Sequence, residues 1–143
     1  MKRELMIALY SIKPIYSNQI INGTKKYELR KRMPAKKLDY ILIYSSSPTS
    51  KVIGYAEVKD IYKNTVHQVW KHTSKYAGIS KKAYEEYFNG CQNAYAIELG
   101  LVKKFVRPFA IEEINQDYVA PQSFAYISHD EFKRVKRRKT KDV

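Results

Sequence analysis

Lysine, glutamate and arginine are crowded into one short segment, Gly23-Thr24-Lys25-Lys26-Tyr27-Glu28-Leu29-Arg30. Its apolar residues alternate with charged ones, which is typical of a β-strand with one apolar and one polar face. On such a strand Lys26, Glu28 and Arg30 share the polar face. Gly23 permits a sharp turn before the strand, so we expect the Lys25 amine to point into a cleft beside that face.

These residue types can support two kinds of chemistry. Glu28 beside Arg30 predicts an ion pair that positions the planar guanidinium for bidentate recognition of an anion. Lys25 and Glu28 together offer an acid and a base for proton transfer, which needs no metal. The same spacing also fits an ordinary salt bridge on a solvated strand, so the pattern alone leaves both interpretations open.

The charge of the chain indicates an anionic partner. Lys and Arg number 27 against 14 Asp and Glu, which gives a formal charge of +13 over 143 residues. Basic residues gather in residues 24–37 and again in residues 133–141. Cations bind phosphate and the 13 tyrosines could stack on bases, although surplus lysine also aids solubility and tyrosines also fill cores. In the second cluster we expect a flexible tail with five phosphate contacts: Arg134, Lys136, Arg137, Arg138 and Lys139.

Other classes of protein have little support in the sequence. The single Cys91 and three histidines without metal-ligand spacing predict neither a disulfide framework nor a metal site. Neither a Walker motif nor a dinucleotide-binding glycine pattern is present, so no cofactor is expected. No apolar stretch reaches the ~18 residues of a membrane span. We therefore expect a cytoplasmic protein of one domain without membrane association.

The expected secondary structure is mainly β. Strands are predicted at residues 5–11, 26–30, 40–44, 52–61, 94–101 and 123–127, and helices at 14–22, 66–75, 80–88 and 129–135. Gly54, inside a strand, indicates a bulge, a barrel bend or a close approach by a ligand. Because regular βαβ spacing is absent, the pattern favours an α+β fold: a small, curved sheet or barrel of five to six mostly antiparallel strands with peripheral helices.

Several segments together resemble one known family. They are the Gly-x-Lys-x-x-Glu-x-Arg segment, Leu42-Ile43-Tyr44-Ser45-Ser46, Val52-Ile53-Gly54, Tyr87-Phe88-Asn89-Gly90 before Tyr95-Ala96-Ile97-Glu98, and Pro121-Gln122-Ser123-Phe124. In this order and spacing they resemble the ASCH family, which is related to the PUA RNA-binding domain. The resemblance covers residues 5–130, so we expect an ASCH domain over residues 1–132 and a basic tail over 133–143.

The resemblance implies a PUA-like β-barrel whose cleft recognises RNA or nucleotides. Its lining would comprise Lys13, Lys25, Lys26, Glu28, Arg30, Tyr44, Ser45, Ser46, Gln122, Ser123 and Phe124. Glu28 and the Ser and Gln groups would then read a base edge, Tyr44 or Phe124 would stack on the base, and the cations would hold phosphate.

Whether the chain is an enzyme stays open at this stage. Some family members are amidohydrolases that remove an acetyl group from a modified cytidine, with a threonine nucleophile at the position that matches Glu28. A carboxylate there supplies no acyl-accepting hydroxyl. Ribonuclease activity has been attributed to other relatives, and acid-base cleavage by Lys25 and Glu28 fits it. Other members occur in transcription coactivators, which leaves a protein-interaction module as a further alternative. The favoured prediction is RNA or nucleotide binding.

Overall fold

Apolar runs of the sequence form the central strands of the fold. In the computed structural model, which describes residues 4–143, β1 (Ile7–Ile12) and β3 (Tyr40–Ser45) are buried along nearly their whole length. They pair in parallel, from Ile7 opposite Tyr40 to Ile12 opposite Ser45. Near-continuous apolar strands of this kind belong in the middle of a sheet, where both faces are covered.

The described residues contain one seven-stranded sheet. Its order is β2-β5-β4-β3-β1-β6, with β7 paired to β5. The remaining strands are β2 (Tyr27–Arg30), β4 (Lys51–Thr65), β5 (Asn93–Phe109), β6 (Phe124–Ile127) and β7 (Thr140–Asp142). Every pair except β1 and β3 is antiparallel. The predicted α+β, mainly β fold is confirmed, with an open curved sheet rather than a closed ring, because within residues 4–143 no ladder joins β2 to β6.

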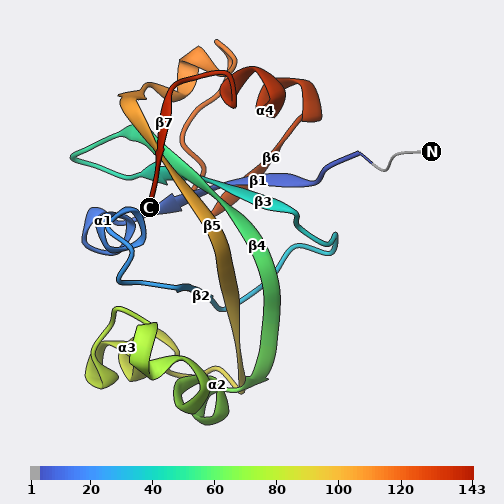
Figure 1. Cartoon of the computed structure of the whole chain (residues 1–143). Helices are drawn as coiled ribbons and strands as arrows, with labels where there is room; N and C mark the ends of the chain where they lie inside the picture. The colour runs from blue at the N-terminus through green and yellow to red at the C-terminus, as the bar shows by residue number, and fades with distance from the viewer. Residues whose placement is uncertain (1–3) are drawn as a thin grey trace.

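Two long strands connect the ends of the molecule. β4 and β5 run together from the region of β7 to the helices α2 (Val66–Thr73) and α3 (Lys81–Tyr87) (Figure 1). Their register shifts three times, once between Val52 and Gly54. The bulge predicted for Gly54 is present. A Cβ on Gly54 would lie 2.5 Å from the Lys103 carbonyl oxygen, so the group that approaches this glycine closely is the backbone of β5. β5 also continues through Pro108, beyond the predicted end of its strand.

The helices begin where the sequence provides suitable caps. α1 (Pro14–Ile21) starts with proline, whose missing N–H is not needed at that position. The hydroxyl of Thr65 caps α2, and that of Ser80 caps α3. α4 (His129–Val135) has the predicted bounds and starts with a capping box between Ser128 and Glu131. Short 3-10 turns lie at Ser74–Tyr76, directly after α2, and at Ile111–Glu113, after β5.

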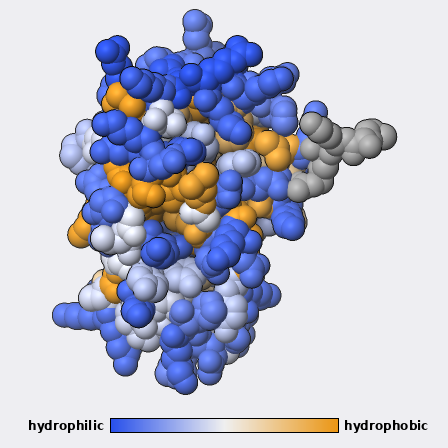
Figure 2. Space-filling model, in the orientation of Figure 1, coloured by the Kyte–Doolittle hydropathy of each residue, from blue (hydrophilic) through white to orange (hydrophobic). Residues whose placement is uncertain are grey.

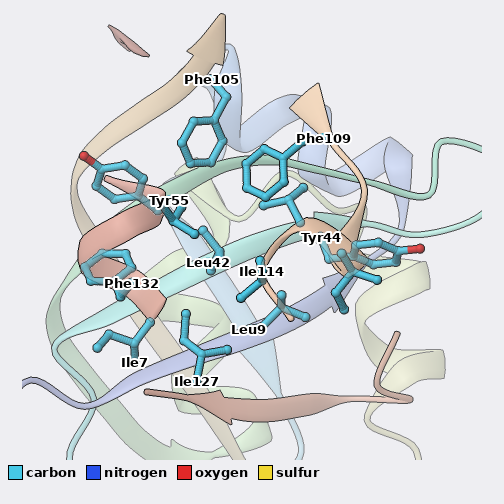
Figure 3. Close-up of a cluster of buried hydrophobic side chains, with 13 residues drawn as sticks. Ile7, Leu9, Leu42, Tyr44, Tyr55, Phe105, Phe109, Ile114, Ile127 and Phe132 are labelled. Atoms are coloured by element: carbon cyan, nitrogen blue, oxygen red, sulfur yellow. The ribbon is translucent and has the colours of Figure 1, made fainter. Parts of the chain in front are cut away.

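An aromatic cluster packs between the sheet and α4. The Tyr55 ring lies 5.7 Å from that of Phe105 and 5.4 Å from that of Phe132, with the three strands β1, β3 and β4 supplying aliphatic neighbours (Figure 3). Offset and edge-on rings at these distances add to the stabilisation from burial. A second cluster lies between the sheet and α1, and a third lies beneath α2 and α3. These three cores fix the strands whose ends build the site.

The segment expected to be a flexible tail is folded onto the domain. Residues 133–135 complete α4, and Thr140–Asp142 form β7, in which Lys141 pairs opposite Lys104 of β5. The Arg138 guanidinium lies 3.8 Å from the centroid of the Phe109 ring and bonds to Glu113 at 3.0 Å. The difference from expectation has a physical reason: β5 offers an open edge, and ladder bonds plus these contacts offset the mutual repulsion of the lysines.

Candidate functional site

A cleft of about 710 Å³ opens where β1 and β3 end, beside α1, β2 and α3. Its lining comes from residues 11–16, 25–30, 44–50, 79–87 and 120–123. The parallel pairing of β1 with β3 brings the carboxyl ends of both strands to one edge of the sheet. Loops at such an edge are a common position for ligand sites. The cleft volume lies in the range of small-molecule and nucleotide pockets.

Lys25 is buried in the wall of this cleft, with 4% of its surface exposed. It follows the turn at Gly23, where φ is +88°. Its ammonium donates a hydrogen bond to the carbonyl oxygen of Ala77 and lies 5.2 Å from the centroid of the Tyr16 ring. Burial lowers the pKa of Lys25, the Glu28 carboxylate partly counters this, and the Arg30 charge adds to the lowering. The ammonium is therefore a stronger acid than that of an exposed lysine.

Glu28 and Arg30 form a largely buried ion pair in the same cleft. Glu28 Oε2 and Arg30 Nη2 are 2.9 Å apart, with 7% and 13% of the two side chains exposed. Arg30 Nη2 also donates to the Ser11 carbonyl at 3.0 Å, and Nη1 donates to Ser123 Oγ at 3.4 Å. The guanidinium lies 4.6 Å from the Tyr10 ring centroid. Arg30 thus connects β2 to the end of β1 and to the loop 120–123.

Two buried polar atoms of this region have no hydrogen-bond partner among the described residues. They are Arg30 Nε and the Tyr10 hydroxyl. Burial raises the pKa of Tyr10 to about 12, the Arg30 charge opposes that rise, and Glu28 supports it. Tyr10 therefore stays neutral beneath the guanidinium.

Hydroxyl groups also belong to the lining, at Ser11, Ser46, Ser47, Ser50 and Ser123. Ser17 donates to Ser45 Oγ at 2.8 Å, which fixes α1 against the end of β3, where Tyr44 and Ser46 line the cleft. Ser11 holds the loop 120–123 through two bonds, from Oγ to the Pro121 carbonyl at 2.6 Å and from its amide to the Ser123 carbonyl at 2.9 Å. This part of the lining therefore combines hydroxyl donors and acceptors with the aromatic ring of Tyr44.

Most residues predicted for the site lie around this one cleft. Its lining includes Lys13, Lys25, Glu28, Arg30, Tyr44, Ser46, Gln122 and Ser123. Three others lie outside the lining. Lys26 precedes β2, and its amine lies 5.4 Å from the Tyr76 ring centroid; Ser45 is fully buried behind the wall; and Phe124 stacks on Tyr10 at 5.4 Å.

The basic residues predicted as tail contacts lie away from the cleft lining. The Arg134 side chain donates to the Ile114 carbonyl at 3.4 Å, and the Lys136 amine lies 5.4 Å from the Tyr40 ring centroid. Arg137 is exposed beside α4, while Arg138 and Lys139 lead into β7.

Sequence reasoning did not single out several lining residues. Tyr16 comes from α1, Tyr87 from α3, and Ser47 and Ser50 from the loop between β3 and β4. The centroid of the Tyr87 ring lies 4.8 Å from the Lys31 amine, and burial raises the pKa of the Tyr87 hydroxyl. The abundance of tyrosine was the available signal, but only tertiary packing shows which tyrosines reach the cleft.

The Thr24 hydroxyl is turned away from the chemistry of the cleft. It contacts Asn22 Oδ1 at 2.7 Å and the Gln19 carbonyl at 3.3 Å, and it is absent from the lining. Ser46 does line the cleft, although no hydrogen bond joins it to Lys25 in the described residues. In the described residues, the hydrogen bond of the Lys25 ammonium goes to the Ala77 carbonyl and not to a hydroxyl group.

Residues 4–143 contain no group of three or more His, Cys, Asp or Glu side chains that could hold a metal ion. Over the same residues, none of the helices has the length and apolar character required to cross a membrane.

Comparison with known proteins gives a consistent picture. An ASCH domain-containing ribonuclease of Zymomonas mobilis is 30% identical over 138 residues, covering 94% of this chain and 90% of the relative. The crystal structure of ASCH from Zymomonas mobilis matches with a TM-score of 0.85 and 29% identity, covering 94% of this chain and 96% of that one. The N-terminal domain of Staphylothermus marinus McrB shares the fold alone, with a TM-score of 0.55 and 11% identity. Residues 11–108 match the ASCH domain, and the chain belongs to the ASCH domain family.

Proposed function

We propose that this chain binds single-stranded RNA in the cleft and cleaves it by acid-base catalysis. The observation that carries the proposal is the buried Lys25 ammonium, of lowered pKa, facing the same cleft as the Glu28–Arg30 ion pair. Perturbed lysines in clefts are typical of functional sites. The similarity to an ASCH domain-containing ribonuclease, over nearly the whole of both chains, supports this choice of reaction.

The proposed reaction uses the RNA 2′-hydroxyl as its nucleophile. This oxygen attacks the adjacent phosphorus, the bond from phosphorus to the 5′-oxygen breaks, and the products are a 2′,3′-cyclic phosphate and a free 5′-hydroxyl. The Glu28 carboxylate takes the proton from the 2′-hydroxyl, and the Lys25 ammonium gives a proton to the departing 5′-oxygen. No net proton is consumed, because Glu28 gains one proton while Lys25 loses one.

Arg30 has the role of stabilising charge on the phosphate in this scheme. Its bonds to Glu28 and to the Ser11 carbonyl, 2.9 and 3.0 Å long, hold the guanidinium in place. Its 3.4 Å contact with Ser123 is the longest of the three, so this is the bond that a phosphate oxygen would replace. A donor held in place before the reaction stabilises developing charge without reorganisation.

The rest of the cleft supports recognition of one unstacked nucleotide. Tyr16, Tyr44 and Tyr87 offer aromatic faces from three different elements, and Gln122 and Ser46 offer donors and acceptors for a base edge. Proteins recognise single-stranded RNA by this combination of stacking and edge contacts. Lys13, exposed at the start of α1, is suited to an adjoining phosphate.

The test compares binding and cleavage in the same samples. Purified protein is incubated in EDTA with a labelled single-stranded RNA of about 20 nucleotides, and the mixture is resolved on native and denaturing gels. Wild type should shift and cut the RNA. Lys25→Met and Glu28→Gln should lower the cleavage rate by about 100- to 10,000-fold. Lys26→Met is the matched control, because its side chain lies outside the lining, and it should cut normally.

Mass spectrometry of the products distinguishes the alternatives. A 2′,3′-cyclic phosphate end supports the proposed reaction. Shifted but intact RNA with every protein would contradict cleavage and leave an RNA-binding module, a function that the +13 charge favours. Loss of the acetyl group from acetylated cytidine in a parallel incubation would instead indicate an amidohydrolase.

A further inference from the structure

A row of basic side chains runs from the rim of the cleft across β5 and β7. We name it the basic ridge; its members are Lys51, Lys104, Arg138, Lys139 and Lys141. Phe105 and Thr140 are paired opposite each other, and Phe105 is buried, so this side of both strands faces the core. Lys104 and Lys141 form the adjacent pair of this ladder, and they face outward because side chains alternate along a strand. Both are exposed.

The paired lysines are an unfavourable arrangement for the isolated domain. Like charges directly opposite each other on antiparallel strands are destabilising, with Cβ atoms only ~5 Å apart. In residues 4–143 no salt bridge is formed by Lys104, Lys139 or Lys141. The neighbouring Asp142 is on the other side of β7, where it pairs with Lys103. An anion bound to the ridge would relieve this repulsion.

The ridge begins at the cleft itself. Ser50 lines the cleft, and Lys51 follows it as the first residue of β4. Val52 pairs with Phe109, whose ring carries the Arg138 guanidinium at 3.8 Å. The hydrogen bonds from Arg138 and from the Ala110 amide lower the pKa of Glu113, and the Lys51 charge contributes to that shift, which places Lys51 near the Arg138–Glu113 pair. Strand pairing thus links Ser50 to β7, from Val52 of β4 opposite Phe109 of β5 to Phe105 of β5 opposite Thr140 of β7.

The ridge is held in a fixed position by the folded C-terminal segment. Phe132 and Val135 anchor α4 in the core, and the amide of Val106 donates to the Lys139 carbonyl at 3.0 Å. Strongly hydrophilic side chains cover this end of the molecule, where β7 and α4 lie (Figure 2). Among the described residues, Arg138 is the one member of this row that forms a salt bridge, to Glu113. A fixed row of cations that are mostly without acidic partners is suited to a polyanion that follows it, as a nucleic-acid backbone does.

We propose that the basic ridge binds the phosphates of the RNA segment that leaves the cleft past Ser50. This inference rests on the proposed function in that one strand occupies both places: one nucleotide in the cleft and the following phosphates on the ridge. Binding along the ridge is independent of base sequence, because its side chains offer only charge and donors to the backbone. The ridge thus sets the preference for long over short RNA, while the cleft performs the chemistry.

The test is the salt dependence of RNA binding by Lys104→Ala/Lys141→Ala. Fluorescence anisotropy measures its affinity for a labelled single-stranded RNA of about 20 nucleotides between about 50 and 200 mM salt. Losing two phosphate contacts should reduce the slope of log affinity against log salt by about 1.4, so that affinity falls about sevenfold less than for wild type over this range. The control, Lys71→Ala/Lys82→Ala, removes the same charge from α2 and α3 at the far end of the molecule (Figure 1). It should keep the wild-type slope.

Cleavage of a dinucleotide, which fills the cleft without reaching the ridge, separates this inference from the proposed function. It should proceed at the wild-type rate in the ridge variant. Equal slopes for the ridge variant and the control would overturn the inference. So would a ridge variant that binds RNA as wild type does but has lost a binding to anionic lipid vesicles that wild type shows. A reduced slope without any cleavage in wild type would retain the ridge and reject the ribonuclease.

Discussion

The Lys25 ammonium donates its hydrogen bond to the carbonyl of Ala77, a residue 52 positions later in the chain. The segment that holds Lys25 also crowds it, because the next residue, Gly78, has φ +67° and lies directly against the Lys25 side chain. The acid proposed for the reaction is thus positioned by a loop that contributes no chemistry of its own.

Gly78→Ala should impair cleavage by displacing Lys25. A Cβ at position 78 would lie 3.1 Å from both Cβ and Cγ of Lys25, and it would clash with the Gln19 side chain, which can swing away. The Lys25 side chain must then shift by a few tenths of an ångström. A displacement of about 1 Å at a catalytic group costs about 100-fold in rate, so cleavage assays should show a smaller loss, of about tenfold. Gly90→Ala is the matched control, since Gly90 also has positive φ (+84°) but nothing lies within 4 Å of its added Cβ.

Both glycine variants should lose about 1–2 kcal/mol of stability from backbone strain. Urea unfolding of the two proteins checks that their stabilities are similar. Normal cleavage by Gly78→Ala, at a stability equal to that of Gly90→Ala, would contradict the positioning role.

The lowered pKa of Lys25 predicts how stability changes with pH. In the unfolded chain Lys25 titrates near its ordinary value of 10.5, whereas burial lowers its pKa in the folded chain. Between those two values the unfolded chain binds more protons, so stability rises with pH. Tyr10, Tyr84 and Tyr118, whose pKa values burial raises to about 12, act in the opposite direction at alkaline pH. The comparison with Lys25→Met cancels their contribution.

The unfolding free energy of wild type minus that of Lys25→Met should therefore increase as pH rises toward 10.5. Urea titrations at several pH values measure it. A difference that stays constant with pH would show that Lys25 titrates normally in the folded protein.

The sequence indicated the centre of the cleft because Lys25, Glu28 and Arg30 lie within six residues. Local spacing and one glycine turn are sufficient to bring such close neighbours together. The bounds of α4 were equally predictable, since a capping box and an apolar stripe are local signals. Long-range contacts gave no such signal. Tyr87 reaches the cleft only because α3 packs on the third core cluster, and Ser50 reaches it only through the parallel pairing of β1 with β3.

The C-terminal segment differed from its prediction for a related reason. Its density of like charges favours a disordered tail when it is considered alone. Pairing with the edge of β5 and the stacking of Arg138 on Phe109 depend on residues 29 to 39 positions away. Neither contact can be inferred from composition.

Gly54→Ala should destabilise the fold at the bulge between β4 and β5. The added Cβ would lie 2.5 Å from the Lys103 carbonyl oxygen, which belongs to the backbone of a paired strand and cannot move freely. Overpacking of this kind costs about 1–3 kcal/mol. Gly100→Ala is the control, because its nearest contact is the flexible end of Glu57 at 3.3 Å. Thermal unfolding of both should show the larger loss for Gly54→Ala; an equal loss would show that the bulge relaxes.

Arg30→Lys should weaken RNA binding although it preserves the charge. The guanidinium contacts Glu28, the Ser11 carbonyl and Ser123 at once, and a lysine ammonium lacks the planar, forked geometry that this requires. Losing a hydrogen bond between charged groups costs about 1.5–3 kcal/mol, so the dissociation constant should rise about tenfold or more. Arg32→Lys, at an exposed position just beyond β2, is the matched control and should bind as wild type does. Anisotropy at one salt concentration measures the affinities of the two variants for RNA. Equal affinities would show that Arg30 acts only through its net charge. The planar contacts to β1 and the loop 120–123 would then contribute nothing to the bound state.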